Sequence, residues 1–150
     1  MVLLIVASAM IFSRFLTVSG LPQALASWVG GLDASPYVVL LCIMGIYMIG
    51  GCVMDPLSFL IITINIFFPM IIKAGFDPIW FGVIIVILLE TGAITPPVGI
   101  NVYVIKGIAQ DIDLHTIFKG IFPFLGAMIL GLIILVLFPG IVLLLPGLLN

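Results

Sequence analysis

The stretch of this chain best suited to chemistry is residues 90–101, which read E-T-G-A-I-T-P-P-V-G-I-N and interrupt a long apolar run. Pro96 and Pro97 carry no amide hydrogen and clash with the preceding turn, so a regular helix cannot pass through them. The residue before a proline also favours extended backbone. We therefore predict a discontinuous helix over about residues 78–110, whose first half ends at Glu90.

The backbone of such a break is suited to binding ions. The first half-helix leaves unpaired carbonyls and the second leaves unpaired amides, which attract cations and anions through the helix dipole. Glycines let the backbone approach an ion closely, and neighbouring hydroxyl and amide groups add oxygens. We expect ion or substrate contacts at Thr91, Gly92, Thr95, Pro96, Pro97, Gly99 and Asn101. The structural alternative is a proline-kinked helix that binds nothing.

Two carboxylates lie at predicted helix ends. Glu90 opposes the dipole of its half-helix, and it could bind an ion or proton, pair with Lys106 or face solvent. Asp55 precedes Pro56 and is better suited to capping a helix than to binding a ligand. The chain contains no H-E-x-x-H or G-x-S-x-G motif and no suitably spaced Cys/His pair. These are the motifs that would indicate an enzyme, so we do not expect one.

Composition indicates an all-α integral membrane protein that contacts the lipid bilayer. Hydrophobic residues make up 65% of the 150 residues and charged residues 7%, against about 25% charged in soluble proteins. The net charge of -2 and the lack of a basic cluster argue against a nucleic-acid partner. Cys42 and Cys52 lie in apolar runs and are interpreted as buried hydrophobes. No cofactor is expected, and the first residues lack the basic segment of a cleaved signal peptide.

The remaining elements follow from hydrophobic length, at about 20 residues per spanning helix. Residues 1–30 predict a re-entrant hairpin around a polar tip, or alternatively a tilted helix kinked at Gly20. Arg14 is costly near the bilayer centre, and we expect it to reach the interface or to pair, with a substrate contact as the lesser alternative. Further predictions are spanning helices at 37–54 and 56–72, an amphipathic interfacial helix at 113–122 and a span at 122–144. The distribution of lysines weakly favours a cytoplasmic position for residues 111–119.

Four stretches together resemble one known family. They are G-A-I-T-P-P-V-G-I-N at 92–101, F-D-P-I-W-F-G at 76–82, G-G-C-V-M-D-P at 50–56 and F-S-R-F-L-T-V-S-G-L-P-Q-A-L at 12–25. They are similar to the C-terminal part of the large membrane subunit of tripartite ATP-independent periplasmic (TRAP) transporters. The resemblance covers residues 1–150. It implies an ion-transporter-like elevator fold of two inverted repeats, each with a re-entrant hairpin, spanning helices and a broken helix. This chain is expected to be a single membrane domain formed by the second repeat.

The same resemblance implies a function, a location and partners. The function is Na⁺-coupled uptake of organic acids, such as C4-dicarboxylates or sialic acid, by a multi-pass protein of the cell inner membrane. The implied partners are an N-terminal half of the permease subunit, a small membrane subunit and a periplasmic substrate-binding protein. By position, the hairpin tip comprises Thr17, Val18, Ser19 and Gly20. Thr17, Ser19 and Gly20 are expected to contact ion or substrate, with the Ser19–Gly20 turn close to the helix break. Na⁺ is expected at Ser19, Thr91, Gly92 and Thr95. The alternative is a truncated, non-transporting membrane interaction module.

Overall fold

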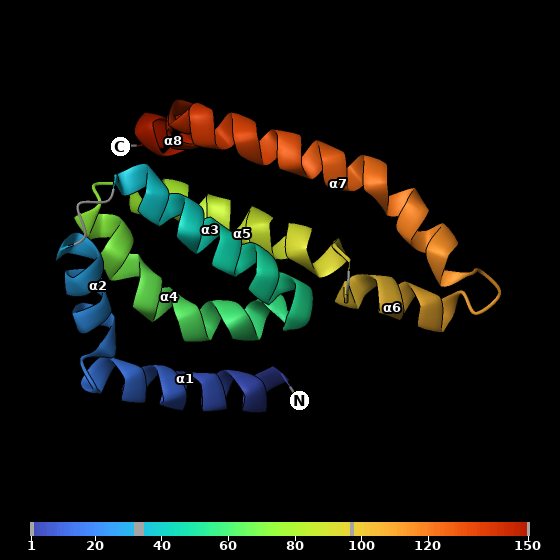
Figure 1. The fold of residues 1–150 in the computed structure, drawn as a ribbon, viewed down its shortest axis with the longest axis horizontal. Coiled ribbons are helices and arrows are strands. Elements are labelled where there is room, and N and C mark those ends of the chain that lie inside the picture. The colour runs from blue at the N-terminus through green and yellow to red at the C-terminus, as the bar shows by residue number, and fades with distance from the viewer. Residues whose placement is uncertain (1, 32–34, 97, 150) are drawn as a thin grey trace.

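The structure is a computed structural model that describes residues 2–31, 35–96 and 98–149, and within them it contains α-helices and no strands (Figure 1). Among these residues, three helices are long and apolar enough to cross a membrane, namely α3, α4 and α7. The chain is therefore an all-α membrane protein, as its composition predicts. The helices are α1 (Val2–Val18), α2 (Leu21–Gly31), α3 (Pro36–Val53), α4 (Pro56–Lys73), α5 (Pro78–Ile94), α6 (Ile100–Ile108), α7 (Leu114–Leu137) and α8 (Pro139–Leu149).

Prolines and aspartates determine where the central helices begin. Helices α3, α4 and α5 each start with a proline, whose missing amide hydrogen costs nothing in the first turn. Asp55 Oδ2 accepts a hydrogen bond from the Ser58 amide at 2.9 Å. Asp77 Oδ1 accepts from the amides of Ile79 and Trp80 at 2.8 and 3.0 Å. The capping role predicted for Asp55 is confirmed, and Asp77 caps α5 in the same way.

The core lies along α5, which packs lengthwise against α3 and also contacts α4 and α7. Side chains from α3 and α5, including Tyr47, Phe81 and Ile84, are buried there. Near the end of this contact the two backbones approach closely at a pair of glycines. A Cβ atom added to Gly92 would lie 2.8 Å from the carbonyl carbon of Gly51. The small residues thus allow α3 and α5 to touch through their backbones, as is common between membrane helices.

Helices α1 and α2 both lie against α4 and meet at a tight turn. Gly20 occupies this turn with a φ of +71°, a left-handed conformation that glycine adopts without steric cost. The two helices form a corner, and α2 rises steeply from the end of α1 (Figure 1). The chain therefore turns at the tip predicted from the sequence. Entry of this tip into a bilayer from one side remains a prediction.

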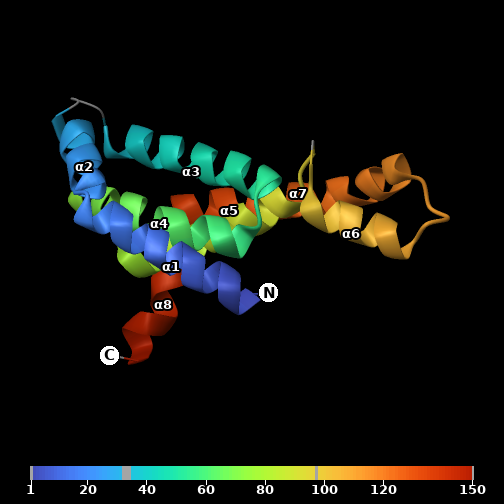
Figure 2. The ribbon, with the colours of Figure 1, turned by 90° about the horizontal axis from the view of Figure 1, so that it is seen from below.

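The C-terminal helices differ from their predicted boundaries. Helix α7 is continuous from Leu114 to Leu137, so the division into an interfacial helix and a separate span at residue 122 is wrong. Gly120 and Pro123, which lie on either side of residue 122, are both accommodated within the helix. The helix ends at Phe138 because Pro139 has no amide hydrogen and disfavours helical backbone at the residue before it. Helix α8 then leaves in a new direction (Figure 2).

Candidate functional site

Helices α5 and α6 are the two halves of the discontinuous helix that the prolines predict. Thr95 has extended backbone, with φ of -84° and ψ of 136°, and Gly99 has a φ of +55°. Beyond the break, α6 continues away from α5 in both views (Figures 1 and 2). Pro96 is exposed, whereas Pro97 lies outside the described residues. The break therefore comprises about five residues, flanked by a helix end on each side.

Helix α5 is one turn longer than predicted, since it continues past Glu90 to Ile94. Residues before Pro96 keep their own amide hydrogens, so the helix persists until the proline removes a donor. The last turn is closed by the Thr95 amide, which donates to the Gly92 carbonyl at 2.9 Å. The Thr95 hydroxyl donates to the Thr91 carbonyl at 2.6 Å.

The extra turn places Thr91 and Gly92 inside the protein. The Thr91 side chain has no exposed surface, and its hydroxyl donates to the Ile87 carbonyl at 2.6 Å. Gly92 lies against the backbone of α3. In this structure both residues hold α5 in place, and only Thr95 of the three candidate residues on this side is partly exposed. A direct contact of Thr91 or Gly92 with an ion stays a prediction.

A cavity of about 340 Å³ lies beside the break. Its polar lining consists of Asp55, Glu90 and Asn101, which come from the start of α4, from α5 and from the first turn of α6. Leucine, valine and proline side chains complete the wall. Carboxylate and amide oxygens from three elements thus face one space, a donor set suited to a hard cation. Asp55 lines this cavity and at the same time caps α4.

Of the three roles considered for Glu90, the structure excludes pairing with Lys106. Lys106, its possible partner, instead donates from Nζ to the carbonyls of Gln110 and Ile112, each at 2.7 Å. Those bonds stabilise the connection between α6 and α7. Glu90 is exposed and lines the cavity. An ion- or proton-binding carboxylate and a solvent-facing one both agree with this position.

The structure does not bring the hairpin tip to the break. Ser13 of α1 accepts a hydrogen bond from Asn65 of α4, so the α1–α2 turn lies toward the C-terminal part of α4. The break lies near Asp55, at the opposite end of that helix. In Figures 1 and 2 the α1–α2 turn lies at the left-hand end of α1, whereas the break lies at the right-hand end of α5. The expectation that Ser19 and Gly20 lie close to the break is therefore wrong for this structure.

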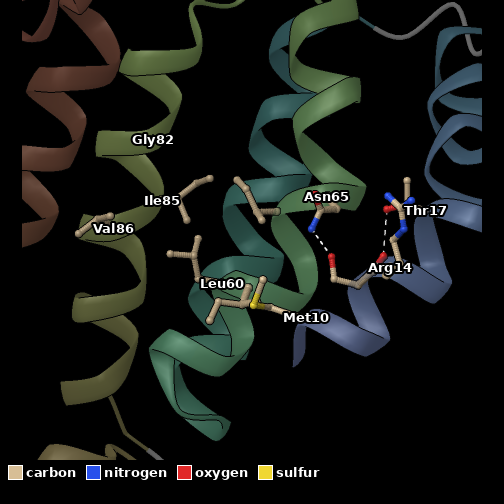
Figure 3. A pocket seen from close by; sticks show the side chains of 11 residues that line it. Met10, Arg14, Thr17, Leu60, Asn65, Gly82, Ile85 and Val86 are labelled. Atoms are coloured by element: carbon tan, nitrogen blue, oxygen red, sulfur yellow. Dashed lines mark hydrogen bonds between the residues drawn. The ribbon is translucent and has the colours of Figure 1, made fainter. Parts of the chain in front are cut away.

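The residues of the tip make local contacts instead. Ser19 donates from Oγ to the Leu16 carbonyl at 2.7 Å, and Thr17 donates from Oγ1 to the Ser13 carbonyl at 2.9 Å. Thr17 also lines a second cavity, of about 650 Å³, between α1, α4 and α5 (Figure 3). This cavity was not predicted from the sequence. The signal that could have indicated it was Asn65, a polar residue within an otherwise apolar span.

Comparison with known proteins agrees with the resemblance in the motifs. Residues 1–141 match the family described as "Tripartite ATP-independent periplasmic transporter, DctM component". The C4-dicarboxylate TRAP transporter large permease protein DctM of Pseudomonas aeruginosa is 38% identical over 147 residues, covering 98% of this chain and 34% of that protein. Its counterpart from Rhodobacter capsulatus is 34% identical over 150 residues, covering 100% of this chain and 34% of that protein.

A relative with a different named substrate is similar over the same length. The sialic acid TRAP transporter large permease protein SiaM of Vibrio cholerae is 32% identical over 147 residues, covering 98% of this chain and 34% of that protein. The chain thus spans about a third of the length of the curated relatives it matches. All three relatives are permease subunits of transporters, and none is an enzyme.

Proposed function

The chain belongs to the DctM component family of tripartite ATP-independent periplasmic transporters, and on that premise we propose that it carries one broken helix of a permease for Na⁺-coupled uptake of organic acids. The observation that carries the proposal is the helix break between Ile94 and Ile100. Non-helical backbone within a membrane protein persists where it is buried in protein or lines a polar cavity. Broken helices of this kind bind substrates and coupling ions in secondary transporters.

The ion would bind at the end of α5 and the organic acid near the start of α6. The C-terminal end of α5 presents carbonyls with partial negative charge, and Thr95 adds a hydroxyl oxygen, so this end favours Na⁺. The first turn of α6 presents unpaired amides, which favour a carboxylate. Ser19 and Gly20 would join this site only after a rearrangement of α1 and α2. The charge pattern of the break therefore suits simultaneous binding of a cation and an anion.

The chemistry of the substrates supports the class of organic acid. Two relatives are named for C4-dicarboxylates and one for sialic acid, and all of these molecules carry a carboxylate. We extend the proposal to the partners implied by the family, which are a small membrane subunit, a periplasmic substrate-binding protein and the N-terminal part of the permease. The proposed location is the cell inner membrane.

The test is uptake by proteoliposomes that contain the assembled transporter and its binding protein. Radiolabelled succinate and sialic acid are supplied with an inward Na⁺ gradient or with K⁺ in its place. We expect uptake of one acid to require Na⁺, and we expect residues 1–150 alone to transport neither. Uptake that is equal in K⁺ would contradict Na⁺ coupling. Unchanged transport after replacement of the break by a continuous helix would instead support the non-transporting interaction module.

A further inference from the structure

The cavity between α1, α4 and α5 has one polar side and one apolar side, and we call it the Arg14 cavity. Its polar side is formed by Ser13, Arg14 and Thr17 of α1 together with Asn65 of α4 (Figure 3). Aliphatic side chains of α4 and α5, among them Ile85, form the opposite side. At about 650 Å³, the cavity lies within the size range of sites for small molecules.

Arg14 is the charged residue of this cavity, since no other charged side chain lies among its described lining residues. A guanidinium is always protonated and presents several N–H donors in a plane. Arg14 is exposed, and no carboxylate lies among the described lining residues to balance its charge. Binding of an anion would provide both the countercharge and acceptors for the N–H groups.

A hydrogen bond between two helices positions the polar side. The Asn65 amide donates from Nδ2 to Ser13 Oγ, a contact between residues 52 positions apart in the chain. Ser13 is itself buried, with 8% of its surface exposed. The amide of Asn65 carries a second N–H donor, so a donor from α4 accompanies the guanidinium from α1. The lining of the cavity thus combines the guanidinium of α1 with a neutral donor of α4.

We propose that the Arg14 cavity binds an oxyanion, a carboxylate or a phosphate, whose hydrocarbon part contacts the aliphatic side. The donors of Arg14 and Asn65 match the acceptor oxygens of such a group, which guanidinium binds in a bidentate manner. The site is separate from the helix break, where Asp55 and Glu90 contribute negative charge. An organic acid and an anionic lipid both supply this chemistry. The organic-acid source rests on the proposed function, whereas the lipid source does not.

The experiment measures binding directly, so it does not depend on Na⁺ coupling or on transport. The assembled transporter is purified and placed in nanodiscs of phosphatidylcholine, which carries no net charge. One arm measures equilibrium binding of radiolabelled succinate. The other arm measures binding of phosphatidylglycerol by native mass spectrometry in detergent, relative to phosphatidylcholine. Together the two arms distinguish a soluble carboxylate from a lipid phosphate.

We expect Arg14→Gln to weaken binding of one probe by about ten- to hundredfold, as for the loss of hydrogen bonds to a charged group. Arg14→Lys keeps the charge and loses the planar donors, so its effect should be smaller. Lys119→Gln is the matched control, because it removes one positive charge from an exposed position on α7 outside the cavity. Its affinities should equal those of the wild type.

A second variant tests the cavity without changing α1. Ile61→Trp fills the space from α4, and Ile61 does not line the cavity beside the break. It should also weaken binding of the probe that depends on Arg14, and it decides the question if Arg14→Gln fails to assemble. Wild-type affinity for both probes in Arg14→Gln, or in Ile61→Trp when only that variant assembles, would overturn the proposal. Loss of Na⁺ dependence in the transport assay would leave this result unaffected.

Discussion

The close contact between α3 and α5 makes Gly92→Ala a sharp test of the structure. A Cβ atom at residue 92 would lie 2.8 Å from the Gly51 carbonyl carbon and the Met48 carbonyl oxygen, and 2.9 Å from the Gly51 Cα. These are all backbone atoms, so no side-chain rotation relieves the clash. Ordinary contacts between carbon atoms begin near 3.5 Å, and the helices would therefore have to separate by roughly 0.7 Å.

The expected energy has two terms of opposite sign. Forcing an extra methyl group into a closely packed contact costs about 1–3 kcal/mol. Replacing glycine by alanine within a helix contributes about 1 kcal/mol in the stabilising direction. Gly45→Ala isolates the second term, because Gly45 lies within a helix, α3, and has no heavy atom within 4 Å of the added Cβ. The difference between the two variants should then equal the packing term, about 1–3 kcal/mol.

The measurement is the free energy of unfolding of the detergent-solubilised protein, titrated with sodium dodecyl sulfate and followed by circular dichroism. Gly45→Ala should equal or exceed the wild type in stability. Gly92→Ala should be less stable than Gly45→Ala by the amount just given. Equal free energies for the two variants would show that α3 and α5 do not approach each other at Gly51 and Gly92.

Three further substitutions test the break and its surroundings. Thr95→Val removes a hydroxyl and keeps the shape of the side chain, so the Na⁺ concentration for half-maximal uptake should rise about five- to hundredfold. The control is His115→Ala, because His115 is exposed at the start of α7. An effect of Thr95→Val on organic-acid affinity alone would assign Thr95 to the substrate instead. Gly99→Ala forces alanine to a φ of +55° and should cost about 1–2 kcal/mol of folding free energy; unchanged thermal stability would contradict the left-handed turn. Trp80→Phe removes the bond from Trp80 Nε1 to the Leu135 carbonyl, 2.8 Å long, and should lower the free energy of unfolding by about 1–3 kcal/mol; an unchanged value would show that this bond contributes nothing.

Features that depend on neighbouring residues were predictable from the sequence. The Asp-Pro pairs at 55–56 and 77–78 begin α4 and α5 because a carboxylate caps the first amides and proline tolerates the first turn. The prolines at 96 and 97 break the helix for an equally local reason. The turn at Gly20 follows from the conformational freedom of glycine. Each of these signals acts within about four residues, so no knowledge of packing was needed.

Features that depend on contacts between distant residues were not predictable in the same way. The position of the hairpin tip relative to the break follows from α1 packing along α4, through a contact between Ser13 and Asn65. The last turn of α5 beyond Glu90 lies against the backbone of α3 at Gly51. Neither interaction leaves a pattern within a short window of sequence. The Arg14 cavity was missed for the same reason, since its polar side combines two helices.

The C-terminal end of α7 shows how a local break and a distant contact act together. In a regular helix the Leu135 carbonyl would accept a hydrogen bond from residue 139, but Pro139 has no amide hydrogen to give. Trp80 of α5, which is 2% exposed, donates its indole N–H to that carbonyl instead. Within the described part of α7, Leu132 is buried, and Leu135 and Val136 pack against the core while partly buried. An unpaired carbonyl is costly away from water, and the Trp80 bond therefore both completes the end of α7 and attaches it to the central helix.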